Sequence, residues 1–372
     1  MNKIMTVVGT RPELIKLSRV IHEIDLFSKH ILVHTGQNYN RELNKVFFDD
    51  LSIRKPDYYL GAAGKSAIET IGQTLIAVEK VVIKEKPTAM LIYGDTNSCM
   101  SALVAKRHQV PVFHMEAGNR SYDDRVPEEI NRRIIDHISD INMPLTEHAR
   151  RYLIAEGINP ETIIKIGSCM QEVLDFYRPK INKSKILEKL KLKDNEYFLV
   201  SAHREENVDR PDRMKMLINT LNKIAKKYKK TIVFSVHPRT KKRLSRLKGL
   251  KINKDIKFIK ALGFLDFIKL QQHAKCVLSD SGTISEESSL LGLKSIMLRQ
   301  AHERPEAMDE AITIMSDLDE KSVLNAIQVV LKQENNLNSV VDYEGGKVSQ
   351  KVIKTILSYT SYVNRTVWKN SL

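Results

Sequence analysis

Carboxylate side chains stand at or near the ends of several apolar segments in the first half of the chain, where they could transfer protons. They are Asp95, Glu116 and, at the start of a later polar stretch, Glu128 or its neighbour Glu129. Carboxylates drawn together in a cleft raise one another's pKa, so that one becomes a plausible acid and another a plausible base. Each of them could instead cap a helix or pair with an arginine, for which the chain offers Arg120, Arg125, Arg132 and Arg133.

Two histidines stand just past apolar segments in the second half of the chain. His203 opens the sequence HREEN, and His237 precedes Pro238 and Arg239. A histidine at such a place can bind a phosphate or move a proton near neutral pH. The alternative for both is a histidine in a surface loop, and it is stronger for His237. No spacing of His, Cys, Asp and Glu indicates a metal site, so none is expected.

Residues 279–307 combine features of a phosphate site. The apolar residues 276–278 predict a strand, and the turn after it leads into a helix with Thr283 and Glu286 spaced like a capping box. The N–H groups of such a helix start, and its dipole, favour an anion. We therefore expect Ser281, Gly282 and Thr283 to contact a phosphate. Taken alone, the turn would be interpreted as an ordinary capped helix, and the HERPEA segment at residues 302–307 favours a ligand site.

Basic residues follow the first predicted strand, at residues 4–8. The sequence GTRPELIK, residues 9–16, turns that strand into a helix with Pro12 in its first turn. Arg11 and Lys16 share this neighbourhood and could both reach an anion at the helix start. The turn lacks the GxGxxG pattern, so a dinucleotide site is not supported.

Strands and helices alternate through most of the chain, which predicts an α/β protein with parallel sheets. We expect strands at residues 31–34, 90–93, 112–114, 197–201, 231–236, 258–259 and 295–298, and helices at residues 67–84, 97–108, 127–137, 213–228, 321–333 and 347–362. Ligands of such sheets bind at the carboxyl ends of the strands. The pattern divides into a Rossmann-like domain at residues 1–169, a second one at residues 170–350, and a last helix, residues 351–372, that crosses back to the first domain. A ligand cleft between the two domains is expected.

Composition limits the classes of function. A chain of 372 residues is too long for one ordinary core, and 42% hydrophobic with 28% charged residues is typical of a soluble protein. No apolar run reaches membrane-spanning length and no signal sequence is evident, so we expect a cytoplasmic protein without a membrane partner. Three separated cysteines agree with reduced thiols. The net charge of +15 comes from scattered lysines, so a nucleic-acid partner is not expected.

The motifs together resemble the non-hydrolysing UDP-N-acetylglucosamine 2-epimerases. The resemblance covers nearly the whole chain, in order, through GTRPELIK, GDT at residues 94–96, HMEAG at residues 114–118, PEE with NR at residues 127–132, HR at residues 203–204, HP at residues 237–238, and residues 279–307. It implies a glycosyltransferase-B-like fold, a UDP-sugar bound in the cleft mainly by the second domain, a homodimer and no cofactor. It also implies C2 epimerisation by loss of UDP to a 2-acetamidoglycal, followed by re-addition.

The resemblance assigns roles to individual residues. Asp95, Glu116 and Glu128 match the catalytic carboxylates, and His203 matches the histidine near the diphosphate. The matching residues for UDP and the sugar are Arg11, Lys16, His237, Ser281, Gly282, Thr283, Glu287 for the ribose, Arg304 for the charged or sugar portion of the substrate, and Leu262 and Phe267 for the uracil. Phe267 could equally be an ordinary core residue.

The substrate and two other functions stay open at this point. The segments NRSYDDR, residues 119–125, and QAHERP, residues 300–305, are similar to the branch that forms UDP-N-acetyl-L-fucosamine from its 6-deoxy-L-talose isomer for capsule or O-antigen. A glycosyltransferase of the same fold is the first alternative, but it would not need three carboxylates in the first domain. A UDP-sugar-binding protein without turnover is the second.

Overall fold

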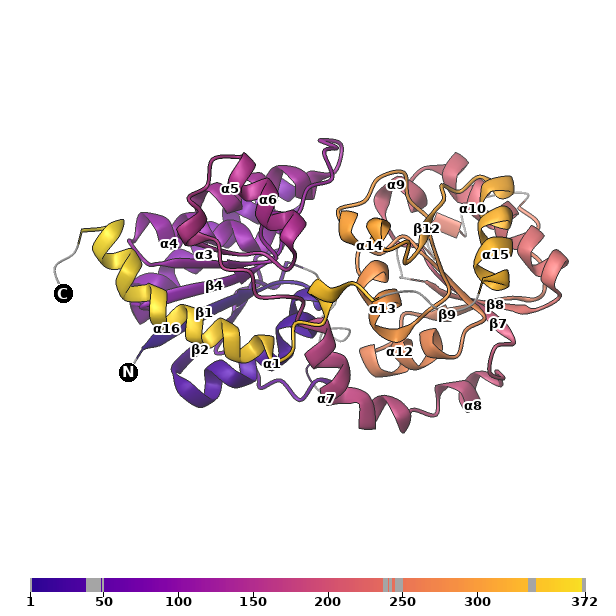
Figure 1. The fold of residues 1–372 in the computed structure, drawn as a ribbon, viewed down its shortest axis with the longest axis horizontal. Coiled ribbons are helices and arrows are strands. Elements are labelled where there is room, and N and C mark those ends of the chain that lie inside the picture. The colour runs from indigo at the N-terminus through magenta and orange to yellow at the C-terminus, as the bar shows by residue number, and fades with distance from the viewer. Residues whose placement is uncertain are drawn as a thin grey trace. The chain divides into compact units, whose positions relative to one another are not determined.

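The chain forms two compact units in the computed structural model, which describes residues 2–37, 48, 50–236, 240, 243–244, 250–333 and 339–369. The first unit contains Met1–Phe176 and Val341–Leu372, and the second contains Tyr177–Val340. The sequence places these divisions after residues 169 and 350. Each unit is built around one parallel sheet with helices, as Figure 1 shows.

The first unit has a six-stranded sheet. Its spatial order is β3 (Tyr58–Tyr59), β2 (Lys29–His34), β1 (Lys3–Val8), β4 (Ala89–Tyr93), β5 (Val112–Met115) and β6 (Ile141–Met143). All neighbouring pairs are parallel. The predicted strands β1, β2, β4 and β5 are confirmed. The two edge strands β3 and β6 were not predicted, because two and three residues are too few to show a pattern.

Helices pack against this sheet and leave their polar sides exposed. They are α1 (Arg11–Phe27), α3 (Ala67–Glu85), α4 (Ala102–Arg107), α5 (Pro127–Ile138), α6 (Glu147–Ala155), α7 (Met170–Asn182), which runs across the division after Phe176, and α16 (Val348–Thr366), with 3₁₀ turns at Asn97–Ser101, Pro160–Thr162 and Val341–Tyr343. The single helix expected at residues 97–108 is instead a 3₁₀ turn followed by α4. The last helix, α16, packs along α1 within the first unit (Figure 1).

Helix α1 shows why these residues form helices. Leu14, Leu17, Val20, Ile21 and Ile24 recur on one face and are all buried. Pro12 stands in the first turn, where a missing N–H costs nothing. Because this face is fully packed, truncating Leu17 to alanine would cost about 2–5 kcal/mol of stability.

The second unit repeats the arrangement of the first. Its sheet runs in the order β12 (Ile314–Met315), β11 (Ser295–Met297), β10 (Cys276–Ser279), β7 (Tyr197–Ser201), β8 (Thr231–Val236) and β9 (Ile256–Lys260), again all parallel. Its helices are α8 (Ile186–Leu190), α9 (Glu205–Val208), α10 (Pro211–Tyr228), α12 (Phe264–Gln272), α13 (Ile284–Leu291), α14 (Pro305–Asp309) and α15 (Glu320–Lys332). The expected strands of this unit are confirmed, apart from β12, which was not predicted.

Each sheet has a point where the chain order reverses, and this point is where open α/β sheets bind ligands. In the first unit it lies between β1 and β4, and in the second between β7 and β10. Residue Ser201 of β7 pairs with Ser279 of β10, so the segments that leave these strands start side by side. The fold therefore places the ends of β1, β4, β7 and β10 at the two positions best suited to a ligand.

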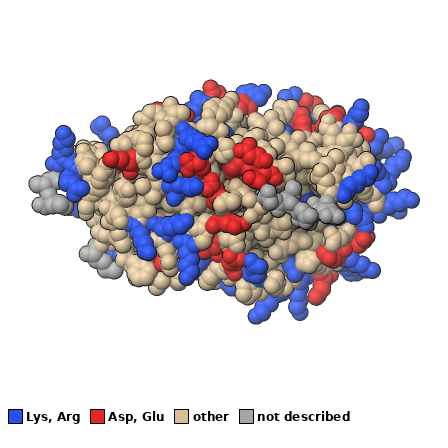
Figure 2. Space-filling model, viewed as in Figure 1, with Lys and Arg blue, Asp and Glu red and all other residues tan. Residues whose placement is uncertain are grey.

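The surface carries mixed charge. Figure 2 shows Lys and Arg side chains scattered over the face in view, with Asp and Glu between them. On this face the distribution agrees with a solvated lysine-rich surface better than with one basic stripe for nucleic acid. Among the helices described, none is both long and apolar enough to cross a membrane.

Candidate active site

At the reversal point of the first sheet, a buried glutamate joins the two turns. Glu13 Oε2 accepts from the N–H groups of Gly9 (2.5 Å) and Thr10 (2.7 Å), and Oε1 accepts from the hydroxyls of Thr96 (2.6 Å) and Ser98 (2.7 Å). Burial raises the pKa of Glu13 even though these four donors oppose the shift. Glu13 thereby holds the turn after β1 against the segment after β4.

Two predicted site residues belong to these turns. Arg11 is the first residue of α1 and is half-buried, and burial lowers the pKa of its guanidinium. Asp95 follows β4, and its Oδ2 accepts from Arg132 through Nε (3.0 Å) and Nη2 (2.5 Å). The sequence left open a pairing between the carboxylates and nearby arginines, and Asp95 has this pairing. A carboxylate held by two donors of one guanidinium is fixed in direction.

Glu116 follows β5 in a strained backbone conformation, with φ +64°. Its Oε2 lies 2.7 Å from Lys16 Nζ and accepts a hydrogen bond from the Tyr93 hydroxyl. Lys16 Nζ also lies over the Tyr93 ring, 5.4 Å from the centroid. Positive φ in a residue other than glycine costs of order 1–3 kcal/mol and concentrates at functional sites. The structure thus joins Lys16, which the sequence places at a UDP site, to one of the candidate carboxylates.

Glu128 and Glu129 differ sharply at the start of α5. Glu129 is buried and accepts from the N–H and hydroxyl of Ser121 (both 2.9 Å), the N–H of Tyr122 (3.3 Å), and Arg132 Nη1 (2.9 Å). Burial raises the pKa of Glu129. The hydrogen bond from the Ser121 N–H, the Arg132 charge and the other donors outweigh burial, so the pKa lies below its usual value. Glu128 is exposed one residue earlier. Glu129 therefore anchors the preceding loop, whereas Glu128 presents an exposed carboxylate.

The loop between β5 and α5 rests on a buried arginine. Arg120 Nη1 binds Asp136 (2.7 Å) and Nη2 binds Glu156 (2.5 Å), and the Arg120 side chain is fully buried. Burial raises the pKa of Asp136, yet its contact with His114 and the Arg120 charge hold that pKa below its usual value. Gly118 at φ +82° lies against the backbone of Ala149, where any Cβ would collide. These contacts fix the loop that follows Glu116.

In the second unit, His203 follows β7 and Asp280 follows the neighbouring strand β10. The buried Asp280 carboxylate accepts from the backbone N–H groups of His203 (3.0 and 3.1 Å) and Arg204 (3.0 Å). His203 Nδ1 lies 3.4 Å from Asp280 Oδ1, and about half of the His203 side chain is exposed (52%). The fold thus presents His203 at the reversal point of the second sheet.

The turn at residues 281–283 has a different hydrogen-bond pattern from the one predicted. The capping box of Thr283 and Glu286 is wrong, because Thr283 has helical dihedral angles (φ −82°, ψ −12°) and its hydroxyl donates to Glu287 (2.9 Å). An N-cap side chain reaches back to the helix N–H groups only from an extended backbone. Gly282 lies so close to Glu303 that a Cβ would stand 2.5 Å from its carboxylate oxygen. Glycine therefore permits the close packing of this turn.

The other described residues that are predicted to bind the UDP-sugar in the second unit are partly or fully buried. Glu287 accepts from Gln271 Nε2 (2.6 Å) and Thr283, and Arg304 Nη2 lies 3.4 Å from the buried Glu286. Leu262 and Phe267 are half-buried and pack against the core that contains Tyr197, Leu199 and Val277. His237 lies outside the described residues.

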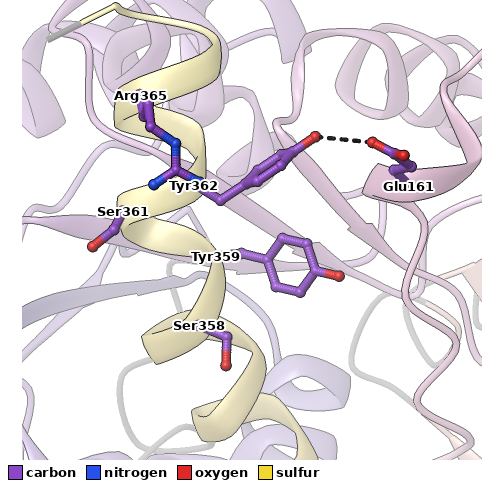
Figure 3. Close-up of a pocket in the computed structure, with 6 residues that line it drawn as sticks. All are labelled: Glu161, Ser358, Tyr359, Ser361, Tyr362 and Arg365. Carbon is purple, nitrogen blue, oxygen red and sulfur yellow. Dashed lines mark hydrogen bonds between the residues drawn. The ribbon is translucent and has the colours of Figure 1, made fainter.

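No cluster of three or more His, Cys, Asp or Glu residues suited to a metal ion occurs in the part of the chain that the structure describes. Figure 3 shows a pocket on α16, lined by Glu161, Ser358, Tyr359, Ser361, Tyr362 and Arg365. The Tyr362 hydroxyl donates to Glu161 (3.3 Å) there. None of the predicted site residues lines this pocket, so it is separate from the candidate site.

Comparison with known protein families assigns the chain to one of them. A family model described as UDP-N-acetylglucosamine 2-epimerase matches residues 23–357. The chain belongs to the UDP-N-acetylglucosamine 2-epimerase family. It is therefore an enzyme, an isomerase of the epimerase type.

Individual members of this family match 94–100% of the chain. The structure of UDP-N-acetylglucosamine 2-epimerase from Rickettsia bellii is 54% identical, with a TM-score of 0.94 and coverage of 100% of both chains. The Methanocaldococcus jannaschii UDP-GlcNAc 2-epimerase, solved in complex with UDP-GlcNAc and UDP, is 36% identical with a TM-score of 0.90, covering 96% of this chain and 99% of that one. A UDP-2,3-diacetamido-2,3-dideoxy-D-glucuronate 2-epimerase from Pseudomonas aeruginosa is 33% identical over 94% of this chain and 98% of its own. The glycosyltransferase-B-like fold expected from the resemblance is thereby confirmed.

Several residues that contact the predicted site residues or hold their turns had no role in the sequence-based prediction. They are Glu13, Tyr93 and Asp280. Tyr93 is the last residue of β4 and Asp280 directly follows β10, so their positions were a usable signal. Glu13 lies within the quoted GTRPELIK motif, but its partners Thr96 and Ser98 are more than 80 residues away and become neighbours only when β1 pairs with β4.

Proposed function

We propose that this enzyme inverts C2 of a UDP-2-acetamido sugar without a cofactor. The observation that carries the proposal is that Asp95 and Glu116 follow the adjacent strands β4 and β5 at the carboxyl edge of the first sheet, in a chain of this family. Asp95 and Glu116 are each held by a buried cation, Arg132 and Lys16. Removing a proton from carbon and returning it requires acid and base groups held in position, and carboxylates of this kind can serve as both.

The proposed reaction has two halves. In the first, a carboxylate removes the proton from C2, the C1–O bond breaks, and the electron pair of the C2–H bond forms the C1=C2 double bond of a 2-acetamidoglycal. In the second, a proton is delivered to the opposite face of C2 and a phosphate oxygen of UDP attacks C1. Atoms and electrons balance, so no oxidant, reductant or cofactor is consumed. Asp95, Glu116 and Glu128 supply the groups that remove and deliver the proton.

Departure of UDP needs assistance, because C2–H is a poor acid and the diphosphate develops charge as it leaves. Cations and donors placed where that charge develops lower the barrier. Arg11 and His203 serve this purpose, and the turn with Ser281, Gly282 and Thr283 binds phosphate. Glu287 takes the ribose, Arg304 the charged or sugar portion of the substrate, and His237, Leu262 and Phe267 complete the UDP site.

The enzyme interconverts either UDP-N-acetylglucosamine and UDP-N-acetylmannosamine, or the UDP-sugars of the 6-deoxy-L-talose and L-fucosamine pair. The product is used to build a capsule or O-antigen polysaccharide. The name of the Pseudomonas relative, 33% identical, shows that family members can differ in the sugar they convert. The test is proton NMR of the purified enzyme with each UDP-sugar. A new anomeric signal from one pair supports the proposal and identifies the substrate, whereas an unchanged spectrum with both contradicts it.

We further propose that the enzyme is a homodimer. Apolar side chains lie exposed along α3, at Ile68, Ile76 and Ile83, and on α5, at Ile130 and Ile134. The α3 isoleucines recur at intervals of seven or eight residues and so share one face of the helix, and exposed apolar side chains grouped on one face are typical of a protein interface. Light scattering at micromolar concentration should give twice the monomer mass of 42.6 kDa, and a monomer mass would contradict the proposal.

A further inference from the structure

Asp280 is a buried carboxylate to which the proposed reaction gives no part. It follows β10 directly, at the reversal point of the second sheet, and is fully shielded from solvent. Four hydrogen bonds within 3.1 Å reach its two oxygens, from the N–H of His203 (two), the N–H of Arg204 and the side-chain amide of Asn207. Burying an ionised carboxylate is costly unless such donors compensate it. These four hydrogen bonds replace the hydrogen bonds to water that the Asp280 carboxylate gives up on burial.

The donors to Asp280 belong mostly to the segment that carries His203. His203 N–H and Arg204 N–H point at the carboxylate, and Arg204 Nε also donates to the Asp280 backbone carbonyl (3.0 Å). Asn207 joins the same carboxylate to the carbonyl of Leu298 (3.0 Å). One side chain thus fixes the backbone of residues 203–204 relative to the strand that precedes the Ser281 turn.

Asp280 also faces the His203 ring. Nδ1 lies 3.4 Å from Asp280 Oδ1, while about half of the side chain remains exposed. A ring nitrogen turned toward a carboxylate carries its proton there, and the second nitrogen, Nε2, then faces away from Asp280. Contacts between catalytic groups are often longer than a hydrogen bond without substrate and shorten in the reacting complex.

We propose that Asp280 is a positioning residue for epimerisation, which acts through His203 by orienting its ring so that Nε2 meets the departing diphosphate. This inference rests on the proposed function, since it needs His203 to assist the loss of UDP. A buried carboxylate that only stabilised the fold would have no reason to couple to His203 in kinetics. Coupling is therefore the property to measure.

The experiment is a double-mutant cycle on kcat with Asp280→Asn and His203→Ala. An asparagine keeps the shape but turns an amide toward the N–H groups of residues 203 and 204, which disturbs the orientation of the ring. Asp280→Asn should lower kcat by about 10²-fold in the wild-type background. In the His203→Ala background it should lower kcat less than about threefold, because the residue it acts through is already lost. The dissociation constant of UDP should change little in either background.

The matched control is Asp319→Asn. Asp319 is another aspartate of the second unit whose carboxylate accepts a backbone N–H, that of Ser322 at 2.8 Å, and it contacts none of the site residues. It should leave kcat unchanged. An equal fall in kcat from Asp280→Asn in both backgrounds would overturn the inference, since it would show that Asp280 does not act through His203.

Ring-nitrogen NMR of ¹⁵N-histidine-labelled wild-type protein tests the same inference without relying on the folding of a variant. The His203 signals are those absent from His203→Gln. The inference predicts a proton on Nδ1, and a neutral ring protonated only on Nε2 would overturn it. If wild-type protein converts neither UDP-sugar pair, the proposed function has failed, and the NMR result still decides whether Asp280 orients His203.

Discussion

Lys16 and Glu116 form an ion pair of 2.7 Å in which the Lys16 side chain is only 3% exposed and that of Glu116 13% exposed. The Tyr93 hydroxyl donates to the same Glu116 oxygen. This arrangement couples a lysine that the sequence assigns to UDP with a carboxylate that it assigns to proton transfer. A buried charge that loses its partner is strongly destabilised, so each member of the pair depends on the other.

This ion pair predicts that replacing Lys16 affects kcat and the binding of UDP to different extents. In Lys16→Met, Glu116 loses the ammonium group that lies 2.7 Å from its Oε2, so kcat should fall by at least about 10²-fold, while the dissociation constant of UDP, measured by calorimetry, changes little. The matched control is Lys106→Met, which removes the partner of another buried carboxylate of the first unit, Asp140, and should leave kcat unchanged. A large loss of UDP affinity with an unchanged kcat would instead place Lys16 at the nucleotide.

Replacing the three carboxylates should separate catalysis from binding. Asp95→Asn, Glu116→Gln and Glu128→Gln keep size and polarity but remove the proton-transfer group, so each should reduce turnover by about 10²–10⁴-fold while retaining UDP binding. Glu79→Gln, at an exposed carboxylate on α3 paired with His108, is the control. Wild-type rates in all three variants would mean that the site assignment is wrong.

His34 should make stability depend on pH. Burial lowers the pKa of His34 from 6.5 to about 4, and its Nδ1 accepts the N–H of Gly36 at 3.0 Å, which requires the neutral ring. Because the unfolded chain binds this proton more readily, His34 contributes stability that is present above pH 6.5 and is lost as the pH falls toward 4. The loss is on the order of 3 kcal/mol.

Urea unfolding between pH 7 and pH 4 checks this expectation. His34→Gln should flatten the fall in the free energy of unfolding over this range, whereas His22→Gln, at an exposed position of α1, should leave its slope as in the wild type. Equal slopes in all three proteins would contradict the role given to His34.

Arg120 should be essential for folding of the loop after Glu116. Arg120→Met leaves the fully buried Asp136 without its guanidinium partner, which should cost about 3–5 kcal/mol in the free energy of unfolding. Arg125→Met, at a position 81% exposed and paired with Asp123, should cost only about 0–1 kcal/mol. If urea titrations show that both variants lose a similar free energy of unfolding, burial of the arginine does not determine the loss.

Much of the fold could be predicted because most of its strands are apolar and buried. Strands β7 and β8 begin and end at the residues that the sequence indicates, since polar residues bound each run. The strands β3, β6 and β12 could not be predicted, because two or three residues carry no periodicity. Their pairing depends on neighbours that only the folded sheet supplies.

The candidate site could be predicted as a group of strand ends, but its internal contacts could not. Asp95, Glu116 and His203 follow strands β4, β5 and β7, as parallel-sheet geometry requires. The partner of His203 is 77 residues away, and the partner of Lys16 is 100 residues away. Such contacts depend on which strands lie side by side, and this order cannot be derived from the spacing of residues in the sequence.

Incorporation of solvent hydrogen at C2 tests the central claim most directly. The enzyme would be incubated in D₂O with UDP-N-acetylglucosamine and, separately, with the UDP-6-deoxy-L-talose analogue, and followed by proton NMR. We predict deuterium at C2 together with a new epimer signal for one of the two substrates. No exchange at C2 with either, from protein that UDP still stabilises against heat, would contradict epimerisation and favour a transferase or a binding protein.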